Sequence, residues 1–148
     1  MVLTSCWRRS ARPTRFNRLM LLDTNIVAYF FRADSRARAY ERHLTGKPLY
    51  ISFVTQGELY RWLFMRPFSE TNRQRLLDHI ARHVVVPYDE HLVWAWAKLT
   101  AECRKNGKPM SLEDSWIAAT AIRHAMPLVT HNRQHFENIS GLTVISEC

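Results

Sequence analysis

Three acidic residues lie in three separated motifs whose residue types suit metal binding and phosphodiester cleavage. Asp23 stands in Leu-Leu-Asp-Thr-Asn, Glu58 in Thr-Gln-Gly-Glu-Leu and Asp114 in Glu-Asp-Ser-Trp-Ile-Ala-Ala-Thr. Carboxylates that a fold brings together raise one another's pKa unless a cation neutralises them. Hard oxygen ligands favour Mg²⁺ or Mn²⁺. The three motifs therefore predict a metal-dependent phosphodiester chemistry.

Short apolar runs alternate with amphipathic segments along most of the chain. We expect five strands, at residues 19–22, 49–52, 84–87, 127–130 and 142–145. We expect six helices, at residues 25–32, 35–44, 53–65, 70–83, 90–106 and 112–125. Such alternation predicts one α/β domain with a mainly parallel sheet.

Each acid also has a purely structural interpretation. Thr55-x-x-Glu58 and Ser111-x-x-Asp114 have the spacing of a helix capping box. Asp23 is suited to cap the turn that follows the first strand. For any one acid taken alone, the structural and the chemical interpretations both stay open.

The predicted layout gives the acids a common location. Asp23 directly follows the first strand, while His131 and Asn132 directly follow the fourth. Ligands of open α/β sheets bind beyond the carboxyl ends of the strands. Because Glu58 and Asp114 come from helices near that edge, we expect the fold to gather these side chains.

Four motifs follow one another along the chain: Leu-Leu-Asp-Thr-Asn, Thr-x-Gly-Glu-Leu, Asp-x-Trp-Ile-Ala-Ala-Thr-Ala and Leu-Val-Thr-His-Asn-x-x-x-Phe. This set resembles the PIN-domain ribonucleases, specifically the VapC toxins of prokaryotic toxin–antitoxin pairs. The resemblance covers residues 20 to about 146. It implies a three-layer α/β/α PIN domain over residues 20–148. It also implies a cytoplasmic endoribonuclease that uses Mg²⁺ or Mn²⁺ and is the toxin of a type II pair.

The resemblance carries roles to individual positions. Asp23, Glu58 and Asp114 match the metal-binding acids, which are expected to activate water for in-line attack on phosphorus. Asn132 stands where many members have a further acid; its carbonyl oxygen can bind a metal, but one negative charge is lost, and the number of ions stays open. Thr130 matches the hydroxyl of the same motif and is expected to bind ligand or water.

Basic residues near the motifs are candidates for RNA contacts. Arg104, Lys105 and Lys108 precede the helix that carries Asp114, and His131 lies between Thr130 and Asn132. A second cluster comprises Arg32, Arg36, Arg38 and Arg42. Phosphate contacts give affinity that falls with salt, although an ordinary solvated surface explains each cation equally well.

Apolar residues around Glu58 indicate a surface for partners. Trp62 and Phe64 enlarge the apolar side of this helix. This surface fits the family's habit of forming homodimers and of binding a VapB-like antitoxin. Zinc is disfavoured, because the i, i+4 histidine pairs lack a Cys ligand set or a His-Glu-x-x-His motif.

The net charge of +8 is unevenly distributed. Residues 1–19 hold five arginines and no acid, which leaves +3 for residues 20–148. We interpret residues 1–19 as a disordered basic extension, with Met20 as an alternative start. An apolar content of 47% suits one core, and no apolar run is long enough to span a membrane. Three widely spaced cysteines fit a reducing compartment.

Other functions remain as alternatives. The first is a PIN fold that keeps the acids but acts as a non-catalytic RNA-binding or scaffold protein. An aspartyl phosphatase is less favoured, because Asn25 stands two positions after Asp23 where such enzymes prefer a second Asp. A nucleotide-binding module is disfavoured, because the four glycines are scattered and form no phosphate loop.

Overall fold

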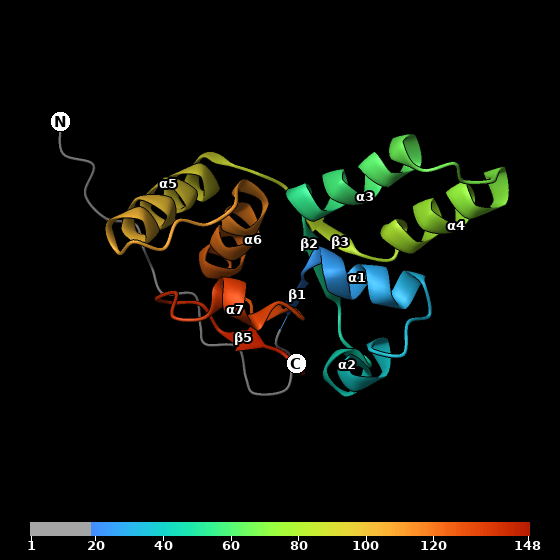
Figure 1. Cartoon of the computed structure of the whole chain (residues 1–148), viewed down its shortest axis with the longest axis horizontal. Helices are drawn as coiled ribbons and strands as arrows, with labels where there is room; N and C mark the ends of the chain where they lie inside the picture. Colours follow the sequence, from blue (N-terminus) through green and yellow to red (C-terminus); the bar gives the residue numbers. More distant parts are fainter. Residues whose placement is uncertain (1–18) are drawn as a thin grey trace.

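The computed structural model describes residues 19–148, which form a parallel sheet covered by helices on both faces (Figure 1). The strands are β1 (Met20–Leu22), β2 (Leu49–Ser52), β3 (Val84–Val86), β4 (Leu128–Val129) and β5 (Val144–Ile145). The helices are α1 (Thr24–Phe31), α2 (Ala37–Leu44), α3 (Phe53–Met65), α4 (Glu70–Ala81), α5 (Glu90–Lys105), α6 (Leu112–Arg123) and α7 (Arg133–Phe136). The predicted three-layer α/β/α class is confirmed. The predicted basic extension lies, apart from Leu19, outside the described residues.

The strand order β3-β2-β1-β4-β5 places β1 at the centre of the sheet. All four neighbouring pairs are parallel, and Leu22 lies opposite Ile51 on one side and Val129 on the other. The chain thus moves from β1 to β2 and β3 on one side, and later returns to β4 and β5 on the other. Such a reversal opens a crevice at the carboxyl ends of the two central strands.

Alternate side chains of β1 enter two separate cores. Leu22 packs in the cluster formed with α1 to α4, whereas Leu21 packs in the cluster formed with α5 and α6. Both side chains are completely buried or nearly so. Because neighbouring side chains of a strand point to opposite faces, three residues suffice to fix the central strand between the two helical layers.

Helix caps explain where the site-bearing helices begin. Ser52 caps α3, and its Oγ accepts a hydrogen bond from the Thr55 N–H at 3.0 Å. The capping box of Thr55 and Glu58 is therefore wrong, and Glu58 is available for other contacts. Ser111 caps α6 as its spacing with Asp114 suggested, since its Oγ accepts from the Asp114 N–H at 3.1 Å. Asp89 caps α5 in the same way, with its Oδ1 accepting from the Leu92 N–H at 2.7 Å.

A glycine follows the end of α5. Gly107 has a φ of 71°, which a glycine adopts without steric cost, and so the helix stops before it. The short helix α7 was not predicted, because four residues are too few to show a hydrophobic period.

Among the described residues, no helix combines the length and apolar character that crossing a membrane requires.

Candidate active site

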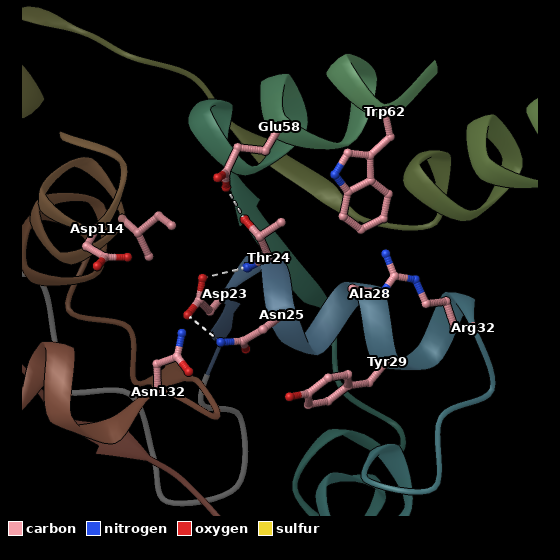
Figure 2. A pocket seen from close by; sticks show the side chains of 11 residues that line it. Asp23, Thr24, Asn25, Ala28, Tyr29, Arg32, Glu58, Trp62, Asp114 and Asn132 are labelled. Carbon is pink, nitrogen blue, oxygen red and sulfur yellow. Dashed lines mark hydrogen bonds between the residues drawn. The ribbon is translucent and has the colours of Figure 1, made fainter. Parts of the chain in front are cut away.

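A pocket of about 320 Å³ opens beside the junction of β1 and α1, with walls from α3 and α6 (Figure 2). Its lining contains every residue that sequence reasoning placed in the catalytic set. The complete lining comprises Asp23, Thr24, Asn25, Ala28, Tyr29, Arg32, Glu58, Trp62, Asp114, Ile117 and Asn132. The fold therefore gathers side chains from four distant parts of the sequence in one cavity.

Asp23 is the most firmly held of the acids, with only 5% of its surface exposed. Its Oδ1 accepts a hydrogen bond from the Thr24 N–H at 2.7 Å, as an N-cap of α1 does. Its Oδ2 accepts from the Thr130 hydroxyl at 2.6 Å and from the Asn25 amide at 3.1 Å. The structural and chemical interpretations are thus compatible: Asp23 caps the helix while its carboxylate lines the pocket.

The surroundings of Asp23 raise its pKa to about 6. Burial is the main cause, because it disfavours the charged form, and the negative charges of Asp114 and Glu58 act in the same direction. The hydrogen bonds from Thr130 and Thr24 oppose this rise. A carboxylate that ionises with such difficulty is stabilised strongly by a cation placed beside it.

Glu58 projects from α3 toward the N-terminus of α1, where its Oε2 accepts a hydrogen bond from the Thr24 hydroxyl (Figure 2). Burial raises the pKa of Glu58, and the charges of Glu113 and Asp114 raise it further. Glu113, which precedes Asp114 in the first turn of α6, does not line the pocket but lies close enough to repel Glu58. Negative charge therefore accumulates on this side of the pocket.

Asp114 lies in the first turn of α6 and contacts a residue that sequence reasoning did not assign to the site. Its Oδ2 lies 2.9 Å from Nδ1 of His135, which comes from α7. His131 faces elsewhere, with its Nδ1 2.7 Å from the Tyr40 hydroxyl. The two histidines thus have separate partners.

The donor set suits Mg²⁺ or Mn²⁺, which prefer carboxylate and amide oxygens. Within residues 19–148, no three His, Cys, Asp or Glu side chains converge as a metal site. All three acids contact protein groups instead, and for two of them this is a single side chain, Thr24 for Glu58 and His135 for Asp114. Ion binding at this pocket would therefore exchange these contacts for metal–oxygen bonds, and the excess negative charge favours that exchange.

Thr130 and His131, expected to contact substrate, lie behind the pocket surface. Thr130 is completely buried, and its hydroxyl donates to Asp23 while accepting from the Asn132 N–H at 3.0 Å. His131 packs edge-on against the rings of Tyr29 and Tyr40. In this structure both residues contact the protein, and Thr130 positions Asp23 and Asn132.

We expect Thr130→Val to raise the pKa of Asp23 further, because the donated hydrogen bond that lowers this pKa would be lost. Leaving the buried carboxylate short of a donor should also reduce the free energy of unfolding by about 1–3 kcal/mol. NMR titration of the Asp23 carboxyl carbon and urea denaturation measure the two effects. Thr130→Ser retains the hydroxyl and should resemble the native protein; an unchanged Asp23 pKa in the valine variant would contradict the assigned role.

The basic residues divide into two groups. Arg104, Lys105 and Lys108 are exposed around the end of α5 and do not line the pocket. Arg32, the first residue after α1, does line it. Two others of its cluster form ion pairs outside the pocket, Arg36 with Asp34 and Arg42 with Glu147, each at 2.7 Å.

Helical spacing could have revealed one further lining residue. Trp62 follows Glu58 by four residues on α3, whereas Arg32 was already a candidate for RNA contacts. Side chains four residues apart share one face of a helix. Once Glu58 is placed at the site, this spacing predicts that Trp62 lies beside it.

The model of the PIN domain family matches residues 20–142. The chain belongs to the PIN domain family. A similar protein is "Ribonuclease VapC1" of Haemophilus influenzae strain R2866, 29% identical over 127 residues that cover 84% of this chain and 94% of that protein. Another is "tRNA(fMet)-specific endonuclease VapC" of Shigella flexneri, 27% identical over 122 residues that cover 82% and 92%.

Solved structures of VapBC complexes share the fold of this PIN domain. The DNA-bound VapBC from Salmonella typhimurium superimposes with a TM-score of 0.78 and 26% identity, covering 88% of this chain and 99% of the matched chain. The five-stranded parallel sheet and its helical layers are thus those of the family. The family membership predicted from the four motifs is confirmed.

Proposed function

We propose that this PIN domain is a metal-dependent endoribonuclease and the toxin of a VapB–VapC-type pair. The observation that carries the proposal is the gathering of Asp23, Glu58, Asp114 and Asn132 around one pocket. The similar proteins named as VapC ribonucleases support the same activity. Hydrolysis of an RNA phosphodiester bond uses the chemistry that such a cluster of oxygen ligands can provide.

Each residue has a defined task in this proposal. Asp23 and Asp114 are the main ligands for Mg²⁺ or Mn²⁺, and Asn132 adds its carbonyl oxygen. When bound, the ion supplies charge stabilisation and lowers the pKa of a coordinated water. Glu58, whose carboxylate is half-buried and already accepts a hydrogen bond, binds the ion or orients the attacking water.

The positions of the acids follow from the fold. Hydrogen bonds from Thr24, Asn25 and Thr130 hold the Asp23 carboxylate in one orientation. Such a fixed ligand needs no reorganisation when substrate arrives, which is the basis of electrostatic preorganisation. Asp23 is thus held in place, whereas Glu58 and Asp114 can exchange their present partners for an ion. This combination allows the site to form around the ion.

A VapB-like antitoxin is the proposed partner, because the similar solved structures are VapBC complexes. The chain also offers exposed apolar surface at the end of α3 for protein contacts. Phe64 and Met65 at the end of α3 have exposed fractions of 84% and 72%. Apolar side chains this exposed on neighbouring residues are typical of interaction surfaces, and a homodimer is proposed on the same grounds.

The proposal predicts that purified, antitoxin-free protein cleaves RNA into discrete fragments with Mg²⁺ or Mn²⁺ but not with EDTA. Total cellular RNA and isolated transfer RNA are the substrates, and we expect 5′-phosphate and 3′-hydroxyl ends. Asp114→Asn should remove the cleavage, because it deletes a negatively charged ligand. Circular dichroism checks that this variant is folded.

Absence of cleavage by folded native protein across these ions and RNAs would favour the alternative of a non-catalytic RNA-binding or scaffold protein. The observation that favours this alternative is Asn132, a neutral residue in the lining of the pocket. A gel-shift measurement on the same samples separates the two, because the alternative requires RNA binding without cleavage.

A further inference from the structure

Arg32, at the end of α1, and Trp62, on α3, form the part of the pocket wall on the side away from Asp114 (Figure 2). The Arg32 guanidinium carbon lies 4.9 Å from the centroid of the Trp62 ring, a cation–π contact between α1 and α3. A second guanidinium, that of Arg66, lies 4.5 Å from the same centroid, but Arg66 does not line the pocket.

Arg32 differs in charge from the acids that line the pocket. Among the described residues that line it, Arg32 is the one cationic side chain, whereas three are carboxylates. A polyanionic strand that approaches the three acids is therefore repelled by them and attracted, among the lining residues, by Arg32. A guanidinium binds phosphate through paired N–H donors, so this position attracts a strand to the pocket and fixes where one phosphate lies.

Trp62 adds a flat aromatic surface on the same wall. Unpaired bases stack on aromatic side chains, and this stacking is the usual way in which single-stranded nucleic acid is held without sequence readout. An exposed cation–π contact is weaker than the stacking of a base on indole. A base can therefore replace the Arg32 guanidinium on the ring and release that guanidinium toward a phosphate.

We propose that Trp62 and Arg32 form a nucleotide subsite, in which Trp62 stacks on the base beside the scissile bond and Arg32 binds the adjoining phosphate. The proposal rests on the proposed nuclease function and names how its substrate is held. Single-stranded RNA is favoured over a peptide as the occupant, because the strand whose phosphate reaches the acids must continue along a wall of the same pocket. The basic residues at the end of α5, which do not line the pocket, have no part in this subsite.

The test is the binding of a short, fluorescently labelled single-stranded RNA to the cleavage-deficient Asp114→Asn protein, followed by fluorescence anisotropy. Adding Arg32→Ala should weaken binding about tenfold and reduce the slope of log Kd against log salt by about one. Adding Trp62→Leu should weaken it by about 5- to 100-fold. On a strand of abasic ribose phosphates, the Trp62 effect should disappear and the Arg32 effect should remain.

Matched controls separate the subsite from general effects. Arg66→Ala removes the same charge from the same ring outside the pocket and should change binding less than about twofold. Trp94→Leu removes a tryptophan that is 76% exposed on α5 and should have no effect. Trp62→Phe keeps an aromatic face and should restore most of the affinity, which guards against a leucine variant that simply folds poorly.

Several outcomes would overturn the subsite. If Arg32→Ala and Arg66→Ala weaken RNA binding equally, the effect of Arg32→Ala would come from the net charge of the protein and not from a subsite. Unchanged RNA binding in Trp62→Leu, with loss of binding to an antitoxin peptide, would make this wall a protein-docking surface. If the Asp114→Asn protein binds RNA through these residues but native protein does not cleave it, the subsite stands and the nuclease proposal falls. If it binds no RNA while the native protein cleaves RNA, the subsite falls and the nuclease proposal stands.

Discussion

Replacing Asp23 by asparagine should lower the rate of RNA cleavage by at least about a hundredfold while the protein remains folded. Metal-assisted hydrolysis relies on several kcal/mol of charge stabilisation, and Asp23 is the acid that the fold holds most firmly. The amide keeps nearly the same shape, so the N-cap contact with Thr24 can persist. Initial rates with saturating Mn²⁺, together with a urea denaturation curve, measure both parts of the prediction.

Asp78→Asn is the matched control for this variant. Asp78 is exposed on α4 and accepts a hydrogen bond from Gln74, so the same change in charge occurs away from the acids. We expect native activity in this control. Full activity in the Asp23 variant would exclude Asp23 from the reaction, whereas a collapse of stability would show that its structural role dominates.

The second large effect concerns pH, because the pKa of Asp23 is raised to about 6. Below this pH the buried carboxyl group holds a proton and cannot bind a metal ion. The apparent affinity for Mg²⁺ or Mn²⁺ should therefore fall about tenfold for each pH unit below 6. Isothermal titration calorimetry of the folded protein at several pH values measures this slope, and Asp23→Asn, which lacks a main ligand, should bind the ion far more weakly at every pH.

The stability of the metal-free protein should change with pH in the opposite direction. The folded pKa of Asp23 lies above the ordinary value of 3.8, so the folded state binds the proton more tightly than the unfolded state. The resulting stabilisation is complete below about pH 4 and is lost as the pH rises through about 6, by about 3 kcal/mol. Urea denaturation in EDTA from pH 4 to 7 measures this loss. The Asp23→Asn variant should lack it, and equal pH profiles in both proteins would contradict the raised pKa.

Local sequence signals predicted the scaffold well because they act through neighbouring residues. The strand at residues 49–52 and the helix at residues 53–65 have the predicted bounds, since Ser52 caps the helix where the apolar strand ends. Apolar runs between helices also predicted the four strands β1 to β4. Their pairing order, with β1 between β2 and β4, could be assigned only by three-dimensional packing.

The contacts of the acids were less accessible to sequence reasoning. Glu58 has the spacing of a capping box with Thr55, yet it contacts Thr24, which is 34 residues away. His135 contacts Asp114, which lies 21 residues earlier in the sequence, and the residues around His135 do not predict this contact. Motifs thus identified which residues share the pocket, whereas their partners depend on how α1, α3, α6 and α7 pack.

The pairing of β1 with β4 means that the first acid depends on residues synthesised near the end of the chain. The Asp23 N–H donates to the carbonyl of Val129 at 2.9 Å, and its carboxylate depends on the Thr130 hydroxyl. While the chain is being synthesised, Asp23 therefore lacks these two contacts until residues 129 and 130 have left the ribosome. We expect RNA cleavage only from chains that extend beyond these positions.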